Sequence, residues 1–126
     1  MERLEALRGP LLDLHREILR AERFDLERFH GRLSGAEFLQ VVTDSLRYSW
    51  LLPLSELIVA IDEALASEEP PPEEPLLDRA RRLLLPPDDD TAFGHQYLRL
   101  LQNAPGVAVA HGAVRQALAP DLGSSR

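Results

Sequence analysis

The stretch from Tyr48 to Leu65, which reads YSWLLPLSELIVAIDEAL, is the most apolar part of the chain and holds its only tryptophan. Its apolar side chains recur at the three- and four-residue spacing of one helix face, and Val59 lies near the opposite side. A helix that is apolar around most of its circumference is normally buried at the centre of a domain. We therefore expect the rest of the chain to be organised around this segment.

Helical periodicity also governs the flanking segments, and no segment shows a convincing alternation of β-branched residues. Leucines form a stripe along the first helical segment, in which Gly9-Pro10 either starts a new helix or kinks a long one. Gly31 can end that segment, and Ser34 with Glu37 has the spacing of a capping box for the next helix. Because the loops are short, we predict an all-α protein, a compact bundle of five to six antiparallel helices.

Residues 67–75, SEEPPPEEP, combine consecutive prolines with glutamates and cannot pack into a core. We expect an extended connector there, between the two helical halves of one domain that spans residues 1–119. Helices are also expected at 76–84, 93–104 and 107–118, the second of them after an acidic N-terminal signal that ends at Thr91. The last residues, 120–126, are expected to form a flexible tail.

Composition narrows the class of function. The absence of cysteine removes disulfides, thiolate catalysis and cysteine-bound metal clusters. The net charge of −7 gives the wrong field for a phosphate backbone, so we expect no nucleic-acid partner. No apolar run is long enough to span a bilayer, and the charged start MERLEALRGP lacks a signal-peptide core. All 14 basic residues are arginine, which is typical of a GC-rich genome. These features predict a bacterial, cytoplasmic protein without a membrane partner.

Candidate metal ligands are few. His15 and Glu22 share one line of the first helix but are separated by roughly 10.5 Å along its axis, too far for one ion to bind both easily. Together with Glu56 they are the candidates for a metal or small-molecule site between helices. The alternative is that His15 bonds a neighbouring helix and Glu56 faces water or an arginine. No catalytic motif can be read from the chain, so we predict no catalytic residue, cofactor or metal.

The apolar central segment also supplies candidate interface residues. Large aromatic side chains such as Trp50 serve as anchors in protein interfaces, although an ordinary core position is the alternative. Burying Val59 together with the residues around it requires neighbours on more than one side, and a second copy of the chain could supply them. The predicted interface residues are Trp50, Leu54, Leu57, Val59 and Ile61.

The segments LLDLHREIL, ERFHGRLSGAEFLQ and WLLPLSELIVAIDEAL, within residues 11–66, resemble a family of small bacterial all-helical proteins of uncharacterised function. The most recognisable part runs from Trp50 to Glu63. The resemblance implies a bacterial, cytosolic, all-helical domain and carries over no active site.

Two functions follow as hypotheses. The first is a non-enzymatic helical bundle that self-associates, as a homodimer, or binds a protein partner. The second is a small-molecule or metal-binding helical protein with its site between helices, which requires histidines and a carboxylate to meet in one cavity. A regulator acting on DNA would need an arginine-lined face.

Overall fold

The computed structural model describes residues 2–44 and 46–119, so the tail expected at 120–126 lies outside the described residues. The described residues form helices and no strand, which confirms the prediction of an all-α protein. None of the helices formed by these residues has the length and apolar character needed to cross a membrane. The elements are α1 (Glu2–His30), α2 (Gly35–Asp44), the 3-10 helix η1 (Leu46–Leu51), α3 (Leu52–Ala66), α4 (Glu74–Leu84), α5 (Ala92–Asn103) and α6 (Pro105–Leu118).

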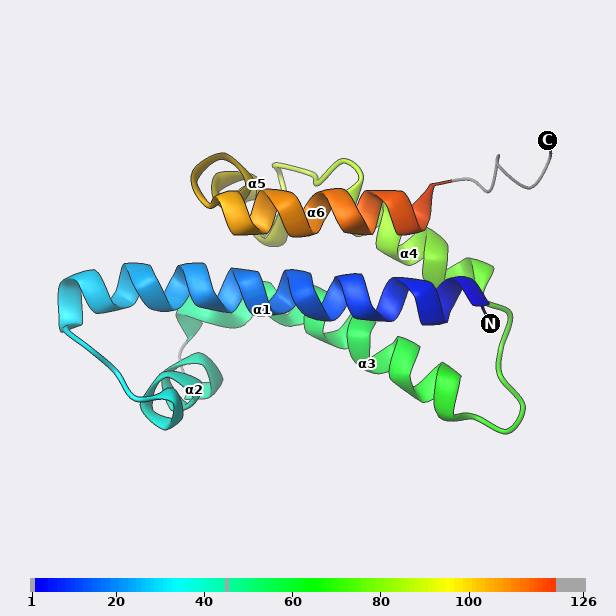
Figure 1. Ribbon diagram of the computed structural model, residues 1–126, viewed down its shortest axis with the longest axis horizontal. Helices are drawn as coiled ribbons and strands as arrows, with labels where there is room; N and C mark the ends of the chain where they lie inside the picture. Colours follow the sequence, from blue (N-terminus) through cyan, green and yellow to red (C-terminus); the bar gives the residue numbers. More distant parts are fainter. Residues whose placement is uncertain (1, 45, 120–126) are drawn as a thin grey trace.

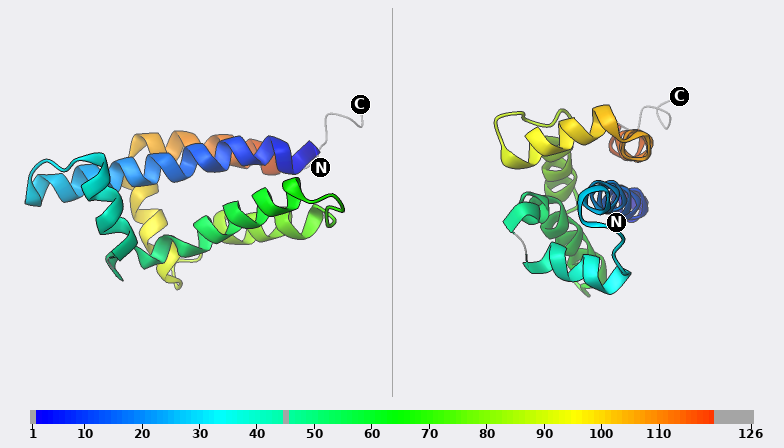
Figure 2. Two further views of the ribbon diagram at one scale, coloured as in Figure 1. Left: turned by 90° about the horizontal axis from the view of Figure 1, so that it is seen from below. Right: turned by 90° about the vertical axis from the view of Figure 1, so that its left-hand side faces the viewer.

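The long helix α1 is the element on which α3 and α6 pack (Figure 1). It packs most extensively against α6 and next against α3, and both of these helices run in the direction opposite to α1 (Figures 1 and 2). Packing of consecutive helices is found for α3 with α4 and for α5 with α6, but the main partner of α1 is the last helix. The segment Tyr48–Leu65, expected at the centre, instead forms η1 and α3 on one flank of α1.

One connected apolar core joins these helices. The stripe predicted on the first segment is buried, because α3 and α6 both pack on the leucine face of α1. The largest fully buried side chains of the core are Leu4, Leu7, Leu11, Leu14 and Ile18 of α1, Leu54, Leu57 and Ile61 of α3, Leu77 and Leu84 of α4, and Tyr97 and Leu100 of α5.

The two alternatives for Gly9-Pro10 are resolved in favour of one helix, since α1 continues through Pro10. A proline crowds the Cβ atom of the residue before it when that residue is helical. Gly9 has no Cβ atom, so this position tolerates the proline better than another residue would. Because α1 is continuous, it extends well past the start of α6 (Figure 1).

The boundary signals at the end of α1 are confirmed. Gly31 has a φ of 80°, and its N–H donates to the carbonyl oxygen of Glu27 at 3.0 Å, as in a left-handed helix stop. Ser34 and Glu37 form the reciprocal capping box, with hydrogen bonds of 3.1 Å and 2.9 Å between side chains and backbone N–H groups. The loop is further held by Arg23, which donates to the carbonyl oxygen of Leu33 at 2.6 Å.

Two boundaries differ from the prediction. Helix α4 begins at Glu74, so the connector is shorter than expected and its last residues form the first turn of a helix, where proline is well tolerated. The turn expected between the last two helices is reduced to Ala104, because Pro105 already occupies the first position of α6. The acidic signal before α5 ends in a true cap, since the hydroxyl of Thr91 accepts a hydrogen bond from the N–H of Gly94 at 2.9 Å.

Gly94 is required by a close approach of two backbone segments. A Cβ atom added there would overlap the carbonyl oxygen of Asp88 and lie 2.5 Å from its carbonyl carbon, and backbone atoms cannot easily move aside. We expect Gly94→Ala to lower the free energy of unfolding by about 2 kcal/mol through overpacking. Gly112→Ala is the matched control, because the space around Gly112 in α6 is open. It should leave stability unchanged or raise it by up to about 1 kcal/mol. Urea denaturation of both variants measures the difference, and equal effects would contradict this account.

Candidate functional site

The three candidate metal ligands do not meet. His15 Nε2 lies 3.1 Å from the hydroxyl oxygen of Ser55, which joins α1 to α3. Glu22 is paired instead with Arg99 of α5, and Glu56 is exposed on α3. Among the described residues, no group of three or more histidine, aspartate or glutamate side chains is placed to hold a metal ion. The geometry therefore lends no support to a metal site at His15, Glu22 and Glu56.

A sequence pair with the spacing Glu-x-x-His, used in helical di-iron sites, is present once, at Glu27 and His30. Such a site needs this pair on two helices. Here Glu27 is committed to the loop after α1, where its carboxylate accepts a hydrogen bond from the N–H of Leu33 at 2.7 Å. Glu27 and His30 are thus part of the C-terminal end of α1.

Two histidines are placed where burial opposes their charge. Burial lowers the pKa of His15. Burial, and secondarily the charge of Arg115, lowers the pKa of His111, whose Nδ1 atom lies 2.6 Å from the hydroxyl of the buried Tyr97. The unfolded chain therefore takes up protons near pH 6.5 that the folded chain still excludes. Stability from these two groups is present at neutral pH and is lost as the pH falls through that window.

We expect the melting temperature to fall on acidification from about pH 7.5 to about pH 5.5. In a His15→Gln/His111→Gln variant this fall should be smaller, because neither glutamine takes up a proton on unfolding. Differential scanning calorimetry at the two pH values makes the comparison. An identical fall of the melting temperature in the wild type and the variant would show that other groups govern the loss of stability at acidic pH.

Four of the five predicted interface residues lie in the protein's own core. Trp50 is 8% exposed and packs on Phe93, with 5.9 Å between ring centroids. Leu54, Leu57 and Ile61 are fully or almost fully buried. These four residues thus occupy the ordinary core positions that the sequence left as an alternative. Val59 differs, because it is 53% exposed.

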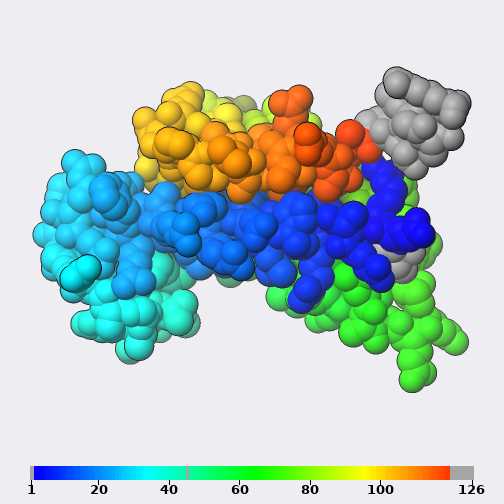
Figure 3. All heavy atoms as spheres, in the orientation of Figure 1, coloured from blue at the N-terminus to red at the C-terminus, as the bar shows by residue number. Residues whose placement is uncertain are grey.

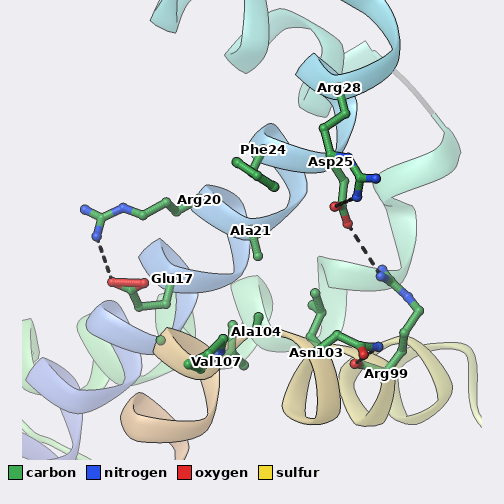
Figure 4. A pocket seen from close by; sticks show the side chains of 13 residues that line it. Glu17, Arg20, Ala21, Phe24, Asp25, Arg28, Arg99, Asn103, Ala104 and Val107 are labelled. Atoms are coloured by element: carbon green, nitrogen blue, oxygen red, sulfur yellow. Dashed lines mark hydrogen bonds and ion pairs between the residues drawn. The ribbon is translucent and has the colours of Figure 1, made fainter.

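A cleft of about 620 Å³ lies between the C-terminal half of α1 and the corner where α5 meets α6 (Figure 4). It exists because α6 begins opposite Glu17, where a Cβ atom on Gly106 would lie 2.5 Å from a carboxylate oxygen of Glu17. Beyond that point α1 continues for more than three turns (Figures 1 and 3). We call this feature the α1 cleft.

The α1 cleft has an apolar base and a charged edge. The residues that line it are Glu17, Arg20, Ala21, Phe24, Asp25 and Arg28 of α1, Arg99, Leu100 and Asn103 of α5, Ala104 between the helices, and Pro105, Gly106 and Val107 of α6. Phe24 projects from α1 between the two charged ends of the cleft (Figure 4) and is 65% exposed. Phe29 of the same helix is also exposed, at 77%, but of the two phenylalanines it is Phe24 that lines the cleft.

An ion pair between the buried Glu22 and the partly exposed Arg99 fixes the wall of the cleft formed by α5. Glu22 is 3% exposed and accepts a hydrogen bond of 2.7 Å from Arg99. The same guanidinium donates to Gln96 at 3.0 Å and lies 3.7 Å from the carboxylate of Asp25. The arginine therefore connects α5 to two successive turns of α1. This pair holds the two helices at the separation that keeps the cleft open.

Tyr48 lies behind this ion pair. Its hydroxyl is buried and has no hydrogen-bond partner among the described residues. Burial raises the pKa of Tyr48, the charge of Arg47 opposes this shift, and the nearby carboxylates of Glu22 and Asp25 add to it. The phenol thus remains neutral and acts as an apolar surface against Phe38, whose ring meets it edge-on at 6.4 Å.

The exposed edge of the cleft is basic although the chain as a whole is acidic. Arg20 pairs with Glu17 at 3.0 Å and Arg28 approaches Asp25 at 4.0 Å. The arginine side chains are 70% and 63% exposed, whereas those of Glu17 and Asp25 are 25% and 35% exposed. The positive groups therefore reach furthest into solvent. An apolar base with a basic edge suits the binding of an apolar segment that carries carboxylates.

Sequence reasoning missed this cleft. The pairing of Glu22 with Arg99 spans 77 positions and has no local signal. Phe24 could have been noticed, because it lies roughly 200° around the helix from Glu22 and the leucine stripe. Comparison with protein-family models, with curated proteins and with solved structures gives no match for this chain. The resemblance of residues 11–66 to a bacterial family therefore stays a prediction.

Proposed function

We propose that this protein is a non-enzymatic interaction module, and that it holds an apolar segment of another protein chain in the α1 cleft. The observation that carries the proposal is the position of Phe24, a large aromatic side chain that is 65% exposed inside a concave surface. Aromatic residues at the centre of a concave patch are typical anchors of protein interfaces. The anchor is therefore Phe24, in place of the residues from Trp50 to Ile61.

The residues that line the α1 cleft support its role in binding another protein segment. Its carboxylates are engaged with arginines, and its other polar groups are arginine side chains, one asparagine and backbone atoms. The occupant is either a second copy of the chain or a different protein. The bacterial and cytoplasmic setting, and partners that are neither nucleic acid nor membrane, belong to the same proposal. They are supported by the arginine usage and by the net charge of −7.

A small molecule in the same cleft is the second candidate. The volume of about 620 Å³ lies within the range of roughly 300–1,000 Å³ that ligand pockets occupy. The pair of Glu22 and Arg99 beside it could orient a polar group. This alternative predicts a retained mass in native mass spectrometry of the purified protein, and loss of that mass in a Phe24→Asp variant.

The proposal is tested by selecting helical peptides from a phage-displayed library on the purified protein and by measuring its self-association by sedimentation equilibrium. We expect either enriched peptides or a dimer, and loss of both in Phe24→Asp. Val109→Asp is the matched control, because Val109 is 76% exposed on α6 and does not line the cleft. Substitution of either exposed side chain should change stability by no more than about 0.5 kcal/mol. A monomer that selects no peptide would overturn the proposal.

A further inference from the structure

We propose that the occupant of the α1 cleft is an amphipathic α-helix of a different protein, with carboxylates at both ends of its apolar face. This inference rests on the proposed function and specifies its partner. Three observations carry it: the line that the cleft follows along α1, the placement of the arginines at its edge, and the poor fit of a symmetric pairing with a second copy.

The cleft continues the path of α6. At one end of α6, Arg3 of α1 donates to the carbonyl oxygen of Ala119 at 2.9 Å. At the other end, Glu17 lies against Gly106. These contacts mark one face of α1, and steps of four, three and four residues along it lead from Glu17 to Ala21, to Phe24 and on to Arg28 in the cleft. A helix placed there would follow α6 end to end.

The length of the open face suits a short helix. From Glu17 to Arg28 the axis of α1 extends roughly 16 Å, which is about three helical turns. The side opposite α1 is formed by Ala104 and Pro105 together with Arg99 and Asn103, whereas Leu100 and Val107 are nearly fully buried at the base. An incoming helix would thus be held between α1 and the corner of α5 and α6, with its apolar side on Phe24.

The arginines at the edge of the cleft favour a bound helix with acidic residues at its ends. Arg20 and Arg28 stand four residues before and after Phe24, on the successive turns that border it. Their ion pairs within this chain are exposed, and such pairs contribute little stability. Arg20 and Arg28 can therefore exchange their intramolecular partners for carboxylates of a bound helix at a small cost in free energy. Arg99 on the opposite wall is already paired with Glu22 and Asp25, so the selectivity rests on Arg20 and Arg28.

A second copy of the chain fits this face poorly. Antiparallel pairing of two α1 helices about Phe24 would place Arg20 of each copy opposite Arg28 of the other. Like charges directly opposed across an interface are unfavourable. Each copy also carries a net charge of −7, which adds a repulsion between the two molecules. A different chain can place carboxylates opposite both arginines, and it also avoids the second obstacle where its own net charge is not strongly negative.

The test uses two synthetic peptides that share one leucine face and differ only in their flanks, glutamate in one and lysine in the other. Fluorescence anisotropy at low salt should show the glutamate peptide binding at least about tenfold more tightly, with a smaller preference at high salt. Arg20→Glu/Arg28→Glu should reverse the preference. Arg82→Glu, on the exposed side of α4 away from the cleft, should retain it.

The outcomes separate this inference from the proposed function. Equal binding of both peptides, lost in Phe24→Asp, would retain an interaction cleft and overturn the acidic helix as its occupant. A dimer that Phe24→Asp dissociates, without glutamate selectivity, would do the same. Binding of neither peptide by a monomeric protein would overturn both proposals.

Discussion

Trp50→Ala is expected to lower the free energy of unfolding by about 3–5 kcal/mol, the cost of truncating a large buried aromatic side chain. Trp50 is 8% exposed and belongs to a row of rings that continues through Phe93 to Tyr97 and His111. Removing the indole opens a cavity where η1 packs on α5, and the surrounding helices can close it only in part. Chemical denaturation followed by circular dichroism gives the change directly.

Leu46→Ala is the control for this experiment. Leu46 belongs to the same short element η1 but is 90% exposed, so its truncation should change stability by no more than about 0.5 kcal/mol. The two substitutions distinguish a core role of Trp50 from an interface role. Normal stability of Trp50→Ala together with a loss of self-association would place the indole at an interface and contradict its position in this core.

Arg99→Ala is expected to destabilise the protein by about 2–3 kcal/mol, because it leaves the carboxylate of Glu22 buried without its charged partner. The estimate lies below the value of about 3–5 kcal/mol for fully buried pairs. The reason is that the Arg99 side chain is 39% exposed, so water can partly replace it. The same substitution removes the connection between α5 and α1 and should weaken peptide binding in the α1 cleft.

The double variant Glu22→Leu/Arg99→Leu tests the origin of this loss. Replacement of both charged groups by apolar side chains leaves no buried charge, so most of the stability should return. Thermal denaturation of Glu22→Leu, Arg99→Leu and the double variant completes a mutant cycle. Destabilisation of the double variant that equals the sum of the single losses would show that the two side chains act independently.

Local chemistry in the sequence was enough to place several boundaries. Gly31, the capping box of Ser34 with Glu37, and the cap at Thr91 each satisfy backbone groups within a few residues, so short patterns predicted them. The leucine stripe of α1 was readable for the same reason, because the helical repeat alone determines which side chains share a face.

The arrangement of the helices was not readable in this way. Periodicity shows that a face is buried but not which helix buries it, and α1 packs mainly on α6. The predicted interface at Trp50 was subject to the same ambiguity. A large apolar residue produces the same sequence pattern in a protein core and in a protein interface. The α1 cleft depends on where α6 starts relative to α1 and on the distant pair of Glu22 and Arg99.

The pairing of α1 with α6 has a consequence for the growing chain on the ribosome. Residues Leu4 to Ile18 are synthesised well before the helix that covers much of their face, which starts at Pro105. The leucine stripe of α1 therefore lacks its main partner while residues 31–104 are synthesised. Exposed apolar stripes of this kind bind chaperones and promote aggregation. Slower translation should lengthen this interval and increase the demand for chaperones.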